Sequence, residues 1–258
     1  MKFAIVQLTS VYDYKENLKK ISSYLKEASL KGASYAFLPE CFYSLSNGEQ
    51  VTEYLVEDGN EHYENIKNLC IQYKIGLIGG SVAYRDGDQI KNRSLNFDMN
   101  GNLLGFYDKN YLFNCKLKNK SINEADIYTE GKEPLIIEVA GLRIGVAICF
   151  DLRFPEFLQY YYKKKVDLIT FSSAFTVHTG KAHWHTLLKA RAIEGQCYVV
   201  ASAQVGQNNE KVSTYGHSLI IDSWGKVLFD MEKSEGVHVF EVDKEQIEYT
   251  RKKIQMRP

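Results

Sequence analysis

A cysteine at the end of an apolar run is the first residue in this chain whose surroundings indicate chemistry. The segment GVAICFDLRF, residues 145–154, begins like a buried strand and turns polar directly after Cys149. Pro155 and Glu156 fit the first turn of a helix, so Cys149 is expected on a strand-to-helix turn. Backbone N–H groups and a helix N-terminus at such a turn lower the pKa of a thiol and stabilise an oxyanion. A buried cysteine is more often a small core residue, and the turn is what favours a nucleophile.

A nucleophilic thiol usually needs a base, and histidine is the usual one. The six histidines, at positions 62, 178, 183, 185, 217 and 238, are scattered, and their spacing does not single out a partner. His183 and His185 lie two residues apart on a predicted helix and therefore point to different faces, which is poor geometry for a metal. The sequence predicts no metal site and leaves the base open.

Composition narrows the class of partner. The 258 residues carry 32 Lys and Arg against 32 Asp and Glu, so no overall field attracts nucleic acid or an anionic membrane. Five widely spaced cysteines without a CxxC pair argue against disulfides and structural zinc. No stretch reaches the roughly 20 apolar residues of a membrane helix, and the first residues turn polar too early for a signal peptide. We expect a cytoplasmic protein with a small-molecule partner.

Strand and helix patterns predict the scaffold that positions Cys149. Apolar residues recur at helical spacing after Asp13, and Gly32 fits the stop of that helix. A polar loop is expected over 111–134. Strands alternating with helices, together with hairpin turns, imply one domain over 1–258, with a mixed sheet or two stacked sheets covered by helices. Further helices are predicted over 61–75, 155–165, 181–196 and 243–254, and strands over 3–8, 34–40, 75–84, 93–99, 102–109, 134–141, 142–149, 167–175, 197–204, 217–223, 227–231 and 236–242.

Three segments, in this order, together resemble the motif segments of the nitrilase superfamily of carbon–nitrogen hydrolases: FLPECF, FYDKNYLF and GVAICFDLRFPE. In that family the motifs supply a glutamate, a lysine and a cysteine, which fall here on Glu40, Lys109 and Cys149. Many members have a second glutamate between the lysine and the cysteine, and NEADIYTEG places Glu124 there. The resemblance covers nearly the whole chain. It implies a four-layer αββα sandwich, a homodimer, and no metal or organic cofactor.

The resemblance also implies a reaction, the hydrolysis of an amide through a cysteine thioester. Glu40 would accept the proton of Cys149, deliver it to the departing nitrogen and then activate water. The ammonium of Lys109 and the backbone N–H of Phe150 would stabilise the oxyanion. Glu124 would orient Lys109 and contact the substrate or water.

The second half of the chain, in SSAF, AHWHTLLKARAIEGQCYVVASAQ and EKVSTYGHS, resembles the Nit1-like branch, which removes ammonia from the terminal amide of deaminated glutathione. Because that substrate has a carboxylate at each end, its site needs cationic or amide-rich contacts. Arg153, Arg191 and Lys211 are the candidates, although a plain surface charge is an equal alternative for each. Phe175, in SSAF, lies where the family shapes its substrate pocket, although plain core packing is an equal alternative.

Two departures from the family pattern concern substrate identity. Tyr111 stands where the family commonly has a histidine, and the lysine-rich segment 114–123 differs from the typical one. Alternative functions are an ω-amidase acting on α-ketoglutaramate or another small amide, a nitrilase, an N-carbamoyl hydrolase, and a binding module that keeps the fold without catalysis.

Overall fold

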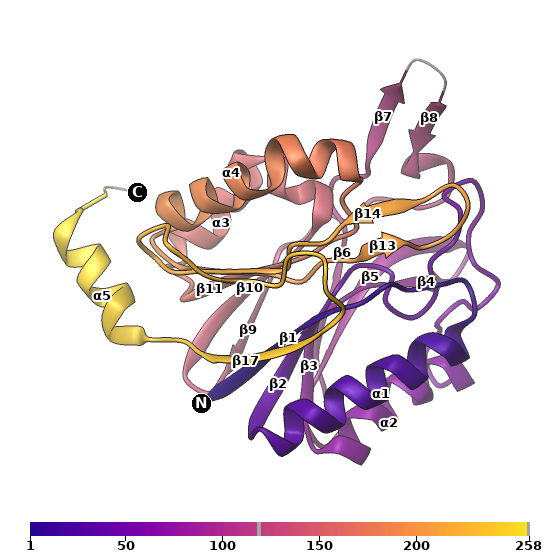
Figure 1. Cartoon of the computed structure of the whole chain (residues 1–258), viewed down its shortest axis with the longest axis horizontal. Coiled ribbons are helices and arrows are strands. Elements are labelled where there is room, and N and C mark those ends of the chain that lie inside the picture. Colours follow the sequence, from indigo (N-terminus) through magenta and orange to yellow (C-terminus); the bar gives the residue numbers. More distant parts are fainter. Residues whose placement is uncertain (118–119, 257–258) are drawn as a thin grey trace.

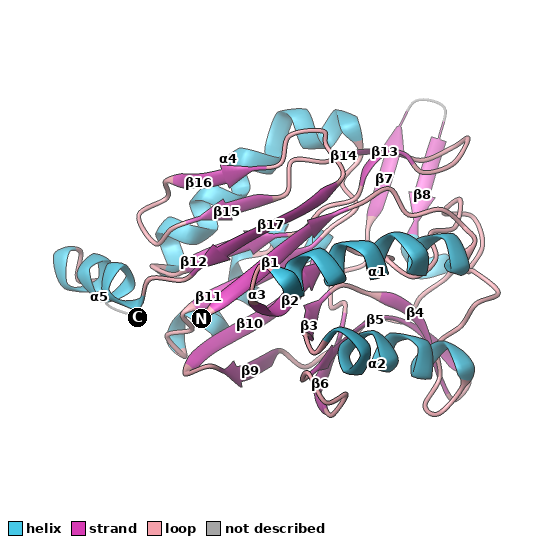
Figure 2. Cartoon of the chain, turned by 60° about the horizontal axis from the view of Figure 1, so that its bottom comes forward, coloured by secondary structure: helices cyan, strands magenta, loops and turns pink. Residues whose placement is uncertain are grey.

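Two β-sheets lie face to face between helices in the computed structural model, which describes residues 1–117 and 120–256 (Figure 1). The helices are α1 (Tyr14–Leu30), α2 (Glu61–Tyr73), α3 (Pro155–Lys163), α4 (Val177–Gly195) and α5 (Lys244–Lys253). Helices α1 and α2 lie side by side over one sheet, α3 and α4 cover the other, and α5 lies beyond the edge of the sandwich (Figure 2). The predicted four-layer αββα sandwich is confirmed. No helix in the described ranges is long and apolar enough to cross a membrane.

The first sheet combines parallel crossovers with hairpins. Across the sheet its strands are β17 (Gly236–Glu241), β1 (Lys2–Gln7), β2 (Ala33–Leu38), β3 (Gly76–Gly79), β5 (Gln89–Phe97) and β4 (Val82–Asp86), with β6 (Leu103–Asp108) also paired to β5. Strands β1, β2 and β3 run parallel because α1 and α2 connect them in turn. Strands β4, β5 and β6 pair antiparallel through the turns that DGDQ and NG predict.

The second sheet carries the cysteine strand near its edge. Across the sheet its strands are β16 (Val227–Asp230), β15 (Leu219–Ile221), β12 (Tyr198–Ala201), β11 (Leu168–Ser172), β10 (Leu142–Ile148) and β9 (Leu135–Val139). Strands β10, β11 and β12 run parallel, since α3 and α4 form their crossovers. Their carboxyl ends therefore meet at one edge, where polar side chains can converge.

Side-chain alternation explains why the sheets stack. Phe3 and Ile5 of β1 pack with the residues of the second sheet, whereas Ala4 and Val6 pack under α1 and α2. Successive side chains of a strand point to opposite faces, and both faces of β1 are apolar. The strand is therefore buried on both sides. The ring of Phe3 lies 5.9 Å from that of Phe37 on β2, so aromatic side chains fill the space between the sheets.

The segment predicted as a polar loop over 111–134 contains regular structure. β7 (Asn114–Leu117) and β8 (Lys120–Asn123) form an antiparallel hairpin that projects from the sandwich (Figure 1), and a short helical turn η1 (Glu124–Asp126) follows. The loop prediction is wrong there because the lysine-rich segment has no clear alternation of apolar and polar residues. Residues 118 and 119 of this segment lie outside the described residues.

Two further corrections concern the second half of the chain. α4 begins four residues before the predicted start, because Thr176 caps it and its hydroxyl accepts from the N–H of Thr179. A small two-stranded sheet, β13 (Val205–Gln207) and β14 (Ser213–Tyr215), was not predicted.

Candidate active site

The end of β2 places a carboxylate between the two sheets. Glu40 follows Pro39, which ends the strand, and its side chain is buried. Oε1 of Glu40 accepts hydrogen bonds from Nζ of Lys109 at 2.8 Å and from Nδ2 of Asn92 at 3.0 Å. Oε2 accepts from the backbone N–H of Ala174 at 2.9 Å. Donors from both sheets therefore fix the orientation of this carboxylate.

A lysine lies between two carboxylates. Lys109 directly follows β6, its side chain is fully buried, and Nζ donates to Glu40 and to both oxygens of Glu124, at 3.0 and 2.7 Å. Glu124 is held in turn by the backbone N–H of Phe113 at 2.7 Å. Burial alone would lower the pKa of Lys109, but the charges of Glu124 and Glu40 raise it well above its ordinary value. The ammonium is therefore a fixed cation at neutral pH.

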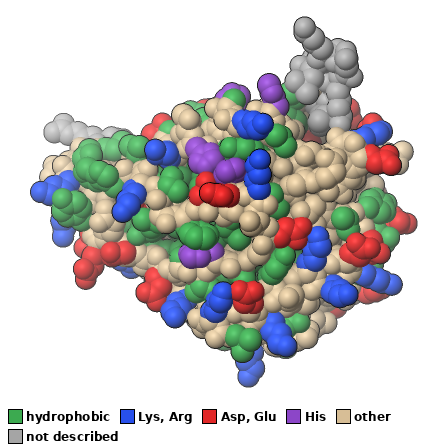
Figure 3. Space-filling view, in the orientation of Figure 1, with side chains coloured by type: hydrophobic (Ala, Val, Ile, Leu, Met, Phe, Trp, Pro, Cys, Tyr) green, Lys and Arg blue, Asp and Glu red, His purple; other side chains and the backbone are tan. Residues whose placement is uncertain are grey.

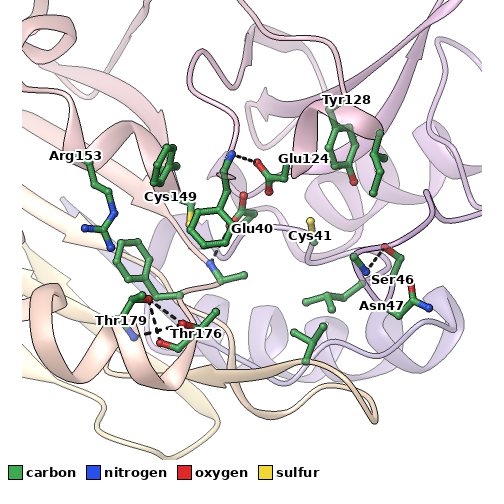
Figure 4. A pocket seen from close by; sticks show the side chains of 18 residues that line it. Glu40, Cys41, Ser46, Asn47, Glu124, Tyr128, Cys149, Arg153, Thr176 and Thr179 are labelled. Atoms are coloured by element: carbon green, nitrogen blue, oxygen red, sulfur yellow. Dashed lines mark hydrogen bonds between the residues drawn. The ribbon is translucent and has the colours of Figure 1, made fainter. Parts of the chain in front are cut away.

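The nucleophile candidate stands at a sharp turn. Cys149 follows β10 and opens a short helical turn, η2 (Cys149–Arg153), with a left-handed backbone at φ 44°. This conformation is uncommon for a residue with a side chain. It aims the thiol into the cavity that Glu40 and Glu124 also line (Figure 4). The predicted strand-to-helix turn is confirmed.

The thiol pKa differs from the prediction. Burial raises the pKa of Cys149 well above its ordinary value, and the charge of Glu40 adds to this, while Lys109 offsets part of the rise. The prediction of a lowered pKa is therefore wrong for this site. One ammonium between two carboxylates leaves a net negative charge beside a desolvated thiol, and this outweighs the turn. The thiol carries its proton at neutral pH until a base removes it.

A buried aspartate holds the turn that carries the cysteine. Oδ2 of Asp151 accepts from the backbone N–H of Ile148 at 2.8 Å and from the hydroxyl of Tyr107 at 2.7 Å. Oδ1 accepts from the backbone N–H of Tyr111 at 2.9 Å. Burial raises the pKa of Asp151 to about 6, although these hydrogen bonds work in the opposite direction. Asp151 thus connects the turn after β10 to the residues on either side of Lys109 through hydrogen bonds.

The cavity in front of these groups has a volume of about 140 Å³. Glu40, Glu124 and Cys149 line it, and the partly buried side chains of Ser46, Asn47, Thr176 and Thr179 supply further polar atoms (Figure 4). Such a site suits a small ligand with one reactive polar end. The rest of its wall is largely aromatic: Phe113, Tyr128, Phe150 and Phe175.

A guanidinium lies beside this aromatic wall. The Cζ atom of Arg153 is 5.8 Å from the ring centroid of Phe150 and 5.3 Å from that of Phe175. Both terminal nitrogens of Arg153 are 3.3 Å from Nδ1 of His183 on α4. Stacking on two rings and contact with one imidazole restrict the side chain. Among the residues described as lining the cavity, Arg153 is the one Arg or Lys.

Known proteins are similar to this chain in sequence and in fold. The carbon-nitrogen hydrolase family matches residues 2–252 of the chain. This chain belongs to the carbon-nitrogen hydrolase family. A deaminated glutathione amidase from Dictyostelium discoideum is 36% identical over 242 residues, which are 89% of this chain and 83% of that protein. An omega-amidase from Xenopus tropicalis is 32% identical over 94% of this chain and 88% of that protein.

Solved structures agree with the fold of this carbon-nitrogen hydrolase. The Caenorhabditis elegans NitFhit protein superposes with a TM-score of 0.90 at 33% identity, over 98% of this chain and 63% of that one. Saccharomyces cerevisiae Nit3, of the nitrilase superfamily, superposes with a TM-score of 0.89 at 29% identity, over the whole of this chain and 95% of that one. The chain spans 56% of the length of the curated nitrilase and fragile histidine triad fusion protein from Caenorhabditis elegans.

The structure of this carbon-nitrogen hydrolase gathers the site residues that the sequence indicated. The ion cluster contains Glu40, Lys109 and Glu124, and Cys149 lines the same cavity. Phe150, Arg153 and Phe175 also line it. The ring of Phe175 packs on that of Trp184 at 4.7 Å as well, so both alternatives for Phe175, pocket wall and core packing, describe it.

Two other candidates, and the departure at Tyr111, lie outside the residues that line the cavity. Arg191 is buried away from the cavity, where Nε donates to the carbonyl of Leu152 at 3.0 Å and the guanidinium pairs with Glu194, so a substrate-binding role for it is wrong. Lys211 pairs with Glu49 at 2.7 Å and is not among the residues that line the cavity. The ring of Tyr111 stacks on Phe154, with 3.7 Å between centroids.

Sequence reasoning missed several buried polar groups around this site, among them Asn92, which donates to Glu40. Asp151 follows the cysteine by two residues, and an acid directly after an apolar strand was the available signal. Gln204 follows β12, and its Nε2 donates to the carbonyl of Glu40 at 2.9 Å and to the hydroxyl of Ser10 at 2.7 Å. No spacing in the sequence connects Gln204 to Glu40, because the contact forms only when the two sheets stack.

Proposed function

We propose that this carbon-nitrogen hydrolase converts the terminal carboxamide of a small carboxylate-bearing compound to carboxylate and ammonia through a thioester on Cys149. The arrangement of Glu40, Lys109 and Glu124 around the thiol carries the proposal. It supplies a base, a fixed cation and an anchor for that cation within one cavity. Deaminated glutathione is the first substrate candidate, because a deaminated glutathione amidase is among the most similar relatives.

The first half-reaction forms the thioester and releases ammonia. Glu40 takes the proton from Cys149 as the sulfur attacks the carbonyl carbon, and the charge that raises the thiol pKa is removed in the same step. The carbonyl oxygen becomes an oxyanion, which the ammonium of Lys109 and the backbone N–H of Phe150 stabilise. Glu40 then gives its proton to the amide nitrogen as the carbon–nitrogen bond breaks.

The second half-reaction consumes one water. Glu40, again a carboxylate, takes a proton from water as its oxygen attacks the thioester carbon. The carbon–sulfur bond breaks, and Glu40 returns the proton to the sulfur of Cys149. The net change is one amide and one water to one carboxylic acid and one ammonia. Glu124 keeps Lys109 in place through both halves.

Arg153 is proposed to bind a carboxylate of the substrate. Its guanidinium lies over the aromatic wall near the outer end of the cavity, where it can form a bidentate pair. In an Arg153→Gln variant, KM for a carboxylate-bearing amide should rise by about tenfold or more. KM for an uncharged amide such as butyramide should change little. An equal rise in KM for both amides would show that Arg153 only supports the aromatic wall of the cavity and does not bind a carboxylate.

An ω-amidase is the second candidate function. Deaminated glutathione carries two carboxylates, yet among the described lining residues Arg153 alone is cationic at the outer end of the cavity. A shorter 2-oxo acid amide such as α-ketoglutaramate has one carboxylate to bind. The similarity to an omega-amidase supports this alternative.

Ammonia release separates the two candidates. We would measure kcat/KM for deaminated glutathione and α-ketoglutaramate side by side, with Cys149→Ala as the blank. A preference of more than about tenfold, near 1.4 kcal/mol of transition-state binding, assigns the substrate. Release from neither compound would contradict both assignments and favour a nitrile, an N-carbamoyl compound or a non-catalytic role.

We also propose that residues 1–258 act as one hydrolase domain, in a cytoplasmic homodimer that takes a small molecule rather than nucleic acid or membrane. The family match over residues 2–252 supports the single domain, and the balanced charge supports a small-molecule partner. Light scattering coupled to gel filtration tests the dimer, since a single monomer mass at micromolar concentration would contradict it.

A further inference from the structure

Three metal-ligating side chains converge on a surface away from the catalytic cavity. His185 comes from α4, His217 from the turn between β14 and β15, and Asp230 from the end of β16. Nε2 of His185 lies 3.1 Å from Oδ2 of Asp230, and Nδ1 of His217 lies 3.1 and 3.0 Å from its two oxygens. Figure 3 shows histidine side chains beside acidic ones on this face. Within the described ranges, these are the three residues whose ligand atoms, one from each side chain, all lie within 4.8 Å of one another.

The surrounding contacts hold these side chains in place before any ion binds. The His217 backbone is left-handed at φ 57°, its N–H donates to the carbonyl of Glu232 at 2.6 Å, and its carbonyl accepts from Nε1 of Trp184 at 2.7 Å. The ring of His217 stacks on Tyr215, with centroids 4.4 Å apart. The backbone N–H of Glu232 also donates to Oδ1 of Asp230 at 2.7 Å. Because these contacts already restrict the side chains, metal binding would cost little further side-chain entropy.

The distances between the ligand atoms and the partial exposure of the side chains suit an ion with tetrahedral coordination. Ligand atoms about 2.0–2.2 Å from zinc stand about 3.3 Å apart in a tetrahedron. The nitrogen–oxygen distances here, 3.0 to 3.1 Å, are close to that value. The side chains are partly covered, with 16% of His217, 26% of Asp230 and 36% of His185 exposed. An ion can enter from solvent and keep a water as its fourth ligand.

We propose that Nε2 of His185, Nδ1 of His217 and the carboxylate of Asp230 bind a divalent transition metal, with zinc as the natural ion. Two imidazoles and one carboxylate favour zinc over magnesium or calcium, which prefer oxygen ligands. To coordinate, the nitrogen of each imidazole that faces Asp230 gives up its proton to solvent, and the neutral ring then carries one proton on its other nitrogen. The carboxylate balances one charge of the ion.

The ion cross-links three parts of the second sheet and its helix layer. It joins α4 to the turn before β15 and to the edge strand β16. Trp184, the neighbour of His185, packs on Phe175 of the cavity wall at 4.7 Å, so the cross-link braces the helix that supports the wall. The sequence predicted no metal site because His183 and His185 point apart. The second imidazole comes instead from a residue 32 positions beyond His185.

Cobalt and zinc binding to the chelator-treated full-length protein tests the site. Titration with Co²⁺, followed by its visible absorption, and with Zn²⁺, followed by calorimetry, should give one equivalent bound at micromolar affinity or tighter. Asp230→Asn, which keeps an acceptor oxygen, and His185→Gln should each weaken binding by more than about tenfold. His178→Gln, on the same helix but exposed and outside the cluster, and Cys149→Ala should bind as the unaltered protein does.

The outcomes are decisive in either direction. Zinc should raise Tm of the unaltered protein and of His178→Gln, and should not raise it for Asp230→Asn or His185→Gln. The absence of an equivalent of bound metal, unchanged affinity in both ligand variants, loss of binding in Cys149→Ala, or a thiolate-to-cobalt charge-transfer band would each overturn the proposal. The test does not depend on the amidase activity, so failure of one proposal leaves the other intact.

Discussion

The charge balance around Cys149 determines when its thiol can react. The side chains of Glu40, Lys109 and Glu124 carry one positive and two negative charges in a buried space. A thiolate would add a third negative charge there, which is why burial and Glu40 raise the pKa of Cys149. In the proposed mechanism, the protonated thiol reacts more slowly with oxidants and with non-specific electrophiles while no substrate is bound.

Replacing Glu40 should therefore change reactivity and catalysis in opposite directions. In Glu40→Gln the negative charge next to the thiol is lost, so the pKa of Cys149 falls and iodoacetamide should alkylate it faster at pH 8. Amide hydrolysis should fall by about 100-fold or more, because the proton acceptor is gone. Peptide mass mapping measures the alkylation at Cys149, with Cys149→Ser as the control. Slower alkylation together with slower hydrolysis would contradict the electrostatic account.

Glu124 should matter through Lys109. In Glu124→Gln the ammonium of Lys109 loses one of its two charged partners, so its position under the oxyanion becomes less defined. We expect kcat to fall by about 100-fold with a smaller change in KM. Glu130→Gln, an exposed neighbour on the same segment, is the matched control and should keep full activity. Equal kinetics for the two variants would show that Glu40 alone positions Lys109.

At the scale of elements, the turn between β10 and α3 depends on a buried acid whose titration has a defined sign. Burial raises the pKa of Asp151 from 3.8 in its ordinary state to about 6 in the folded chain. The folded protein then binds a proton more tightly than the unfolded chain. The resulting stability is complete below about pH 4 and is lost as pH rises to about 6.

Asp151→Asn should remove this pH dependence. From pH 4 to pH 6.5, the free energy of unfolding of the unaltered protein should fall by about 2 kcal/mol through this residue, relative to the variant. Urea denaturation of both proteins at the two pH values measures the difference. Parallel changes in the two proteins would refute a raised pKa at Asp151.

Some elements could be predicted from the sequence and others could not. Helix α1 was predictable at both ends, since Asp13 accepts from the N–H of Lys15 at 2.8 Å and Gly32 takes a left-handed φ of 81°. The hairpin of β7 and β8 lacked such local signals. The catalytic grouping came from the motifs and their family, because no local pattern relates Glu40 to Lys109, 69 residues away. The prediction of a lowered pKa for Cys149 was wrong for the same reason, since that pKa depends on burial and on charges from distant segments.

At the scale of the whole molecule, buried glutamine side chains join the two sheets, and one of them contacts the backbone of Glu40. Gln7 on β1 donates to the carbonyls of Glu232 and Ser234, both at 3.0 Å, and accepts from the N–H of Ser218 at 2.7 Å. Gln204, after β12, accepts from the N–H of Ser10 at 2.8 Å. Apolar stacking between sheets tolerates small sliding, whereas these hydrogen bonds fix the register.

Gln204→Leu tests whether this register sets the catalytic geometry. The substitution nearly conserves volume but removes the hydrogen bonds to the hydroxyl and N–H of Ser10, to the carbonyl of Glu40 and to Nδ2 of Asn208. Four lost bonds with buried partners should lower the free energy of unfolding by about 4 kcal/mol, measured in urea. Because the backbone of Glu40 is released, kcat should fall as well, even under conditions in which the variant is fully folded. Gln207→Leu, at an exposed position of β13, is the control and should keep both values. A destabilised Gln204→Leu protein with normal kcat would show that donors to the Glu40 side chain, rather than the register of the sheets, place the base.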